Sequence, residues 1–126
     1  MATIKCSYSC PLALAMDIIG GKWKMIILWV LRDGVLRFSE IKKILPGITQ
    51  KMLTQQLREL EESGIVSRVV YPVVPPKVEY SVTVEGQKIL PILNQLCDWS
   101  TEYANLNSIQ YTYPCSTEEC ISRRQD

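Results

Sequence analysis

The feature that most constrains the fold is a change in the spacing of the apolar residues at Gly64. Before this glycine, apolar side chains recur with the spacing of helices, whereas residues 65–71 and 78–83 are short runs rich in β-branched and aromatic side chains. Three prolines separate the two runs, and because proline has no backbone N–H to donate, we expect them at the tip of a hairpin. The pattern therefore predicts a group of helices followed by one two-stranded hairpin.

The other elements are expected to be helical. Glycine and proline breaks, together with the apolar periodicity, predict helices over about 12–19, 23–32, 39–45, 49–63 and 84–103, with a short extended piece at 36–38. Ser39, Thr49 and Thr83 are expected to cap the helices that follow them, because a hydroxyl oxygen can accept a hydrogen bond from the first turn. Pro91 should kink the last helix or displace its start.

The length of the chain limits the number of domains. At 126 residues and 14.4 kDa, residues 1–126 fit one domain, with a core over about 10–103 and a segment 104–126 of unassigned role. No segment approaches the roughly 18 consecutive apolar residues that cross a bilayer, and the N-terminal stretch lacks the apolar part of an export signal. We therefore expect a cytoplasmic protein without a membrane partner, whose five cysteines are reduced.

The sequence contains no histidine, which excludes several classes of enzyme site. There can be no histidine general base, no Ser-His or Cys-His nucleophile, and no use of the commonest metal ligand. Cys6, Cys10, Cys115 and Cys120 could together hold zinc, but neither pair has the usual C-x₂-C spacing. A thiol oxidoreductase would need a C-x-x-C pair or a Cys-His site, and the chain has neither. We therefore expect no catalytic residue, no metal and no cofactor.

The net charge of +1 hides an uneven distribution of charge. Residues 22–58 contain eight basic and two acidic side chains, whereas residues 59–126 contain five basic and ten acidic ones. A basic segment in a near-neutral protein favours a local surface that binds a polyanion, although a merely solvated surface explains the charge counts equally well. The placement of the basic residues on the helices distinguishes a polyanion-binding surface from a merely solvated one.

Helices 39–45 and 49–63, joined by a short Pro-Gly turn, have the length of a helix-turn-helix unit. The second helix has leucines on one side, and on the opposite side only amide, hydroxyl and basic groups. Glutamine suits adenine, arginine suits guanine, and threonine can contact a thymine methyl, so this side predicts contacts with base edges. The candidate DNA-binding residues are Arg37, Thr49, Gln50, Lys51, Thr54, Gln55, Arg58 and Lys77. Arg37, with Lys42 and Lys43, lies on the preceding elements that should flank the phosphate backbone, and Lys77 lies beside the hairpin tip.

The acidic residues of this helix, Glu59, Glu61 and Glu62, are confined to its C-terminal end. A helix that enters a DNA groove by its N-terminus keeps that end away from phosphate. The alternative is an ordinary amphipathic helix with a solvated polar face. The basic residues on the preceding elements, and a following hairpin that carries Lys77, favour the arrangement of a wing beside a recognition helix.

Six short motifs occur in the order found in a known family. They are CP at 10–11, IGGKW at 19–23, RFSE at 37–40, ITQKML at 48–53, LRELE at 57–61 and PPKVEY at 75–80, in a match that extends to Trp99. In these motifs the chain resembles the HxlR family of bacterial and archaeal winged-helix transcriptional regulators, which are relatives of the MarR group. The resemblance implies a mainly α (α+β) fold, a winged helix-turn-helix with a C-terminal dimerisation helix. It also implies a homodimer on a pseudo-palindromic operator in double-stranded DNA, with helix 49–63 in the major groove and hairpin 65–83 as the wing.

The last helix carries an apolar series that a domain of this size cannot easily cover by itself. We expect a homodimer interface formed by Ile89, Leu93, Leu96, Trp99 and Tyr103, and the resemblance places the interface in the terminal helices too. The alternative function is a winged-helix protein-interaction module without specific DNA binding. Such a module predicts acidic or apolar residues on the outer side of helix 49–63, and these are absent.

Cys10 occupies the position at which the resembled family has a cysteine. In the redox-sensing members of that family this thiol is reactive, so the resemblance makes Cys10 a candidate redox switch on DNA binding. The alternative is an inert structural thiol.

Overall fold

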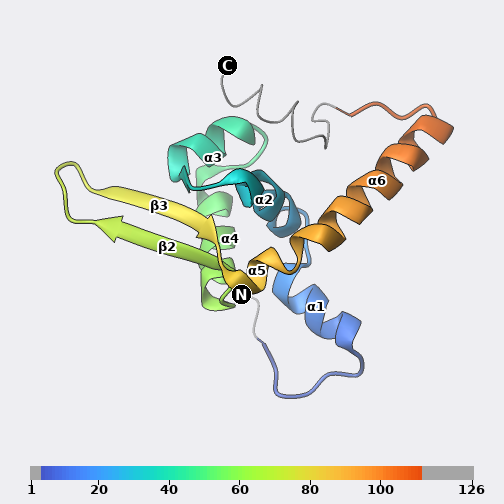
Figure 1. The fold of residues 1–126 in the computed structure, drawn as a ribbon, viewed down its shortest axis with the longest axis horizontal. Helices are drawn as coiled ribbons and strands as arrows, with labels where there is room; N and C mark the ends of the chain where they lie inside the picture. Colours follow the sequence, from blue (N-terminus) through green and yellow to red (C-terminus); the bar gives the residue numbers. More distant parts are fainter. Residues whose placement is uncertain (1–3, 112–126) are drawn as a thin grey trace.

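The computed structural model describes residues 4–111, and its elements follow the expected order (Figure 1). The helices are α1 (Pro11–Ile19), α2 (Lys24–Val30), α3 (Phe38–Ile44), α4 (Gln50–Glu62), α5 (Val84–Gln87) and α6 (Leu90–Leu106), and a 3₁₀ turn, η1 (Leu31–Asp33), continues α2. The strands are β1 (Leu36–Arg37), β2 (Val66–Tyr71) and β3 (Lys77–Val82). This mainly helical arrangement with one small sheet confirms the winged helix-turn-helix fold. Cys115 and Cys120, two of the four residues considered for zinc, lie outside the described residues.

The three strands form one antiparallel sheet in the order β1-β3-β2. One face of the sheet carries Val66 and Tyr80, which are buried against the helices. Because side chains alternate along a strand, Val69, Glu79 and Lys77 belong to the opposite, outer face. Beyond its root the β2–β3 hairpin extends away from the helices, as a wing does (Figure 1).

The core lies where α4 packs against α2 and the root of the sheet. Leu53, Leu57 and Leu60 of α4 are at most 1% exposed, which confirms the leucine side of this helix. They meet Ile27 and Leu28 of α2 in the same buried cluster. Burying one such side chain contributes about 1.5–3 kcal/mol, so the leucines determine which side of α4 is left to solvent.

Two of the three expected helix caps are confirmed. Thr49 Oγ1 accepts a hydrogen bond from Met52 N at 3.1 Å, and Thr83 Oγ1 accepts one from Gly86 N at 3.1 Å. The Thr83 hydroxyl also donates to the carbonyl oxygen of Gly64 at 2.6 Å. One side chain thus connects the end of the α4 segment, the root of the wing and the start of α5.

The expectation that Ser39 caps α3 is wrong, because the helix already includes Phe38. Glu40 explains the earlier start. Its Oε1 accepts a hydrogen bond from the backbone N–H of Arg37 at 2.9 Å, so it satisfies a donor at the helix entrance from the third helical position. Ser39 is therefore inside the first turn rather than before it.

Pro91 displaces the start of the last helix instead of kinking it. The single helix expected over 84–103 is divided, since α5 ends at Gln87 and α6 begins at Leu90, with Pro91 in a first turn that needs no N–H from it. From there α6 projects from the helical core on the side opposite to the wing, and α1 lies on the same side as α6 (Figure 1). At 17 residues α6 is the longest helix in the described range, and no helix there has the length and apolar character needed to cross a membrane.

Candidate nucleic-acid interface

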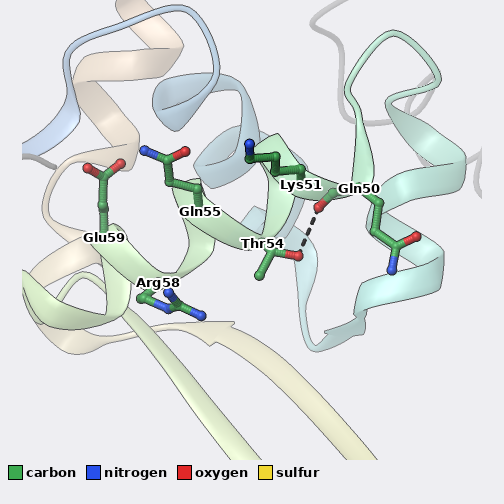
Figure 2. A pocket seen from close by; sticks show the side chains of 6 residues that line it. All are labelled: Gln50, Lys51, Thr54, Gln55, Arg58 and Glu59. Carbon is green, nitrogen blue, oxygen red and sulfur yellow. Dashed lines mark hydrogen bonds between the residues drawn. The ribbon is translucent and has the colours of Figure 1, made fainter.

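The side of α4 that faces away from the leucines is a continuous polar surface (Figure 2). An open hollow along it is lined by Gln50, Lys51, Thr54, Gln55, Arg58 and Glu59. All but the last are sequence-predicted candidates, and all of these are exposed to solvent. The fold therefore brings the candidates of this helix together on one side of it.

The polar groups of this surface differ in what they do within the protein. Thr54 Oγ1 donates to the Gln50 carbonyl oxygen at 2.8 Å, and Thr49 Oγ1 is used as the helix cap. Because Thr54 is exposed and its hydroxyl is engaged within the helix, its methyl group is the part that suits a contact with a thymine methyl. Among residues 4–111, the side chains of Gln50, Gln55 and Arg58 make no hydrogen bond or ion pair. Their donors and acceptors are available to a ligand.

Glu59 is the acidic member of this lining, yet it is buried. Its Oε2 lies 3.6 Å from Nζ of Lys24 in α2, and Gln56 Nε2 donates to the same oxygen at 3.4 Å. The carboxylate that comes nearest to the polar side of α4 is therefore held by a buried cation. Glu61 and Glu62 lie at the C-terminal end of the helix and are exposed there.

Arg37 and Lys77, the two candidates on the sheet, are both next to Glu79 on its outer face. Arg37 is exposed and pairs with Glu79 in the β1–β3 register. Lys77 Nζ lies 2.8 Å from Glu79 Oε1 and 5.1 Å from the centre of the Tyr71 ring. A phosphate that binds Lys77 would have to compete with the Glu79 carboxylate.

Arg68 is a basic wing residue that the sequence analysis missed. It is exposed in β2, opposite Tyr80 of β3, and in the described part of the chain its side chain makes no ion pair or hydrogen bond. It lies on the same sheet face as the buried Val66, and β2 packs against α4. The available signal was a single arginine inside a run of β-branched residues.

The protruding part of α6 is mostly apolar. Leu96, Trp99 and Tyr103 are 45–61% exposed, and the two aromatic rings stack with their centroids 5.4 Å apart. Ile89 and Leu93, which were expected at the same interface, instead pack against the core of the chain, and Leu93 is 4% exposed. The first turns anchor α6, so only its later turns are open to a partner. Other exposed apolar residues on this side of the molecule are Ile92 and Leu106, with Leu12 and Met16 of α1.

Cys10 is exposed immediately before α1, and its side chain makes no capping hydrogen bond. The segment before it is tied to α1, because Tyr8 Oη donates to Asp17 Oδ2 at 2.8 Å. The backbone N–H of Lys5 donates to Tyr8 Oη and lowers its pKa, but desolvation and the Asp17 carboxylate outweigh this, so the pKa of Tyr8 is raised above its ordinary value. The Cys10 thiol is thus accessible beside a segment that hydrogen bonds hold in place.

Comparison with known proteins finds similar sequences and similar structures. The profile of the HxlR-like helix-turn-helix family matches residues 18–108. An uncharacterized HTH-type transcriptional regulator of Methanothermobacter thermautotrophicus is 53% identical over 98 residues, which cover 78% of this chain and 75% of that protein. YkvN of Bacillus subtilis, another uncharacterized HTH-type transcriptional regulator, is 49% identical over 115 residues, which cover 91% of this chain and 98% of that one. The structure of the redox regulator HypR in its oxidized form has a TM-score of 0.71 and 53% identity, covering 74% of this chain and 96% of HypR.

Proposed function

Because the chain belongs to the HxlR-like helix-turn-helix family, a family of transcriptional regulators and not of enzymes, we propose that it is a homodimer that binds a pseudo-palindromic operator in double-stranded DNA. The observation that carries the proposal is the exposed side of α4. There, amide and guanidinium groups without a partner in residues 4–111 form one surface beside a wing.

In this proposal α4 lies in the major groove and approaches the bases with its N-terminal half. Gln50, Thr54 and Arg58 are four residues apart, so they follow one another along the helix. Lys51 and Gln55 form a second row beside them (Figure 2). A glutamine can bind adenine through two hydrogen bonds, and an arginine can bind guanine in the same way. The two rows supply the groups that distinguish one base pair from another.

Phosphate contacts come from the elements around α4. Thr49 and the free N–H groups of the first turn suit a phosphate at the helix N-terminus. Arg37 is exposed on β1 of the sheet, and the wing adds Arg68 and, in competition with Glu79, Lys77. These contacts fix the orientation of the protein on DNA without identifying a sequence, and they place the wing on the backbone or the minor groove.

The homodimer is proposed to form through the exposed part of α6. Leu96, Trp99 and Tyr103 expose enough apolar surface to anchor an interface, and aromatic residues are favoured in such positions. A two-fold dimer presents two α4 helices to half-sites that are about 34 Å apart, one turn of DNA.

The test is selection of DNA from a random duplex library by the purified full-length protein, followed by footprinting on the selected duplex. We expect an inverted repeat that is bound about 10³-fold or more tightly than a shuffled duplex of the same composition at physiological salt. Equal binding of the two duplexes would contradict the proposal and would favour a protein-interaction module.

We further propose that oxidation of Cys10 weakens DNA binding, in a cytoplasm that keeps thiols reduced until an oxidant arrives. The exposed thiol on the side of the molecule that carries α6, together with the similarity to the redox regulator HypR, supports this proposal. Two thiols lose two protons and two electrons as one S–S bond forms, to the partner subunit or to a small thiol. An oxidant such as diamide accepts both and becomes the hydrazine. A small rotation at the dimer interface would then misplace both α4 helices.

Operator affinity after diamide and after dithiothreitol tests this proposal, with Cys10→Ser as the matched variant. We expect diamide to weaken binding of the wild type at least tenfold and to leave Cys10→Ser unaffected. Equal affinities under all four conditions would make Cys10 a structural thiol, and a loss in both proteins would place the switch at another cysteine.

A further inference from the structure

A buried ion pair joins α4 to α2, and the proposed function does not use it. Lys24 and Glu59 are each 5% exposed, with Nζ and Oε2 3.6 Å apart. By contrast, three pairs join residues at most three positions apart in sequence, namely Arg32–Asp33, Lys77–Glu79 and Lys88–Glu85. The Lys24–Glu59 pair instead links two helices that are far apart in the sequence.

Stability does not explain this pair. Removing two charges from water is unfavourable, and replacing a buried ion pair by apolar side chains of similar size often stabilises the folded protein. The leucines of α4 already hold the helix on the core. What the pair adds is a restriction on movement of α4 relative to α2, because a movement that separates the two buried charges loses their mutual attraction.

The position of Glu59 makes this restriction a rotational one. Glu59 is four residues after Gln55 and eight after Lys51, and Figure 2 shows the three side chains on the same side of α4. Apolar contacts are non-directional and tolerate a small rotation, whereas a rotation that moves Glu59 away from Lys24 loses the Coulomb attraction between two buried charges. Gln56 holds the Glu59 carboxylate on α4, so its charge turns with the helix. A side-chain atom about 6 Å from the helix axis moves by about 1 Å when the helix rotates by about 10°. Such a shift is enough to spoil a hydrogen bond to a base edge.

The other end of the pair is attached to the most connected helix of the fold. Besides α4, α2 packs against α3 and against α6, the helix of the proposed dimer interface. Lys24 is in the first turn of α2 and is buried there. The rotation of α4 is therefore set relative to the same element on which α6 is seated.

We propose that Lys24 and Glu59 are positioning residues that fix the rotation of α4 about its own axis and so determine operator specificity without contacting DNA. The proposal rests on the proposed function for its effect on DNA. The rotation itself is a property of the free protein and can be measured without DNA.

The test variant is Lys24→Met with Glu59→Met, which replaces the pair by apolar side chains of similar length and keeps the net charge. Both changes are made together, because either one alone leaves an unpaired buried charge and favours unfolding. The matched control is Lys88→Met with Glu85→Met, which removes a pair whose side chains are 67% and 69% exposed. Thermal unfolding and light scattering verify that both variants keep the fold and the oligomeric state of the wild type.

On DNA, we expect the Lys24/Glu59 variant to lose at least tenfold in affinity for the duplex selected by the wild type. Its affinity for the shuffled duplex, and the salt dependence of that affinity, should stay within twofold, because no cation that faces DNA has changed. The Lys88/Glu85 control should match the wild type on both duplexes. A Lys24/Glu59 variant that discriminates between the duplexes as well as the wild type does would overturn the proposal.

In the free protein, residual dipolar couplings of the α4 backbone N–H groups report the rotation of the helix relative to α2. We expect the phase of these couplings along α4 to shift in the Lys24/Glu59 variant and not in the control. Unshifted couplings would also overturn the proposal. A shift in couplings together with a wild type that does not discriminate between duplexes would mean that the pair positions α4 and that the proposed function fails.

Discussion

At the scale of single residues, Gln50 and Arg58 are the clearest candidates for base recognition, because neither side chain has a partner in residues 4–111. Gln50→Ala or Arg58→Ala should cost about 1–3 kcal/mol of operator binding and relax specificity at one position in each half-site. Affinities for a panel of single-base operator variants measure both the loss of binding and the relaxed specificity. Gln87→Ala on α5 is a control that should leave affinity and specificity unchanged. A loss that is equal for all operator variants would argue against a base contact.

Arg68 and Lys77 are both basic wing residues, but of the two only Lys77 is paired with a carboxylate among residues 4–111. Arg68→Ala should weaken binding to all sequences and lower the slope of log K against log salt by roughly one unit. Lys77→Ala should lower the slope by less, and Glu79→Gln should raise affinity for both selected and shuffled duplexes. Salt titrations of the three variants provide the comparison. An equal change in slope for Arg68→Ala and Lys77→Ala would mean that Glu79 does not compete with phosphate for Lys77.

The sequence was sufficient to locate the polar residues of α4, because a helix whose leucine side is known has a defined opposite side. It was not sufficient to place Lys24, which follows Lys22 in a polar helix start and is nevertheless buried. Its partner, Glu59, is on another helix and is brought to it only by packing. Local periodicity carries no information about such pairs.

At the scale of secondary structure, the start of α4 depends on Thr49. Because its Oγ1 accepts a hydrogen bond from Met52 N, Thr49→Ala should reduce the free energy of unfolding by about 0.5–2 kcal/mol, whereas Thr49→Ser should retain most of it. Urea unfolding without DNA measures the cap separately from any contact that Thr49 makes with phosphate. If the alanine and serine variants were equally stable, the hydroxyl would contribute nothing measurable to the free energy of unfolding as a helix cap.

The errors at this scale have local causes. Ser39 and Glu40 are both able to cap a helix, and the structure uses the glutamate because it binds the N–H of Arg37 from inside the helix. Pro91 allowed either a kink or a later start, and a proline in the first turn costs no hydrogen bond. Sequence patterns give both alternatives in each case, and tertiary packing selects one.

At the scale of the whole molecule, the wing and α6 project from opposite sides of the core (Figure 1). Leu96→Glu together with Trp99→Glu should yield monomers with much weaker operator binding, because a charge in the centre of an apolar interface has no partner. Light scattering gives the mass. Val74→Glu changes a 99% exposed apolar residue at the wing tip and should leave the dimer intact. A double variant that remains dimeric would exclude this part of α6 as the interface.

The separation of the two surfaces could not be derived from the sequence. The apolar series of the last helix predicted a partner, but it did not distinguish Leu93, which faces its own core, from Leu96 and Trp99, which do not. That distinction depends on how far α6 extends beyond the helices that it packs against. It is set by the position of α6 on α2 rather than by the composition of α6.

The hydroxyl of Thr83, which joins the end of the α4 segment to the wing root and to α5, has a consequence for the operator. Because these hydrogen bonds couple the end of the α4 segment to α5, which packs against α6, we expect α4 and the base of α6 to move together. In the proposed dimer the separation of the two α4 helices is then fixed. Each base pair inserted between the half-sites turns one of them by about 35° around the DNA axis. We therefore expect the protein to accept inverted repeats of one spacer length only, which makes the unread spacer as selective as the bases that α4 contacts.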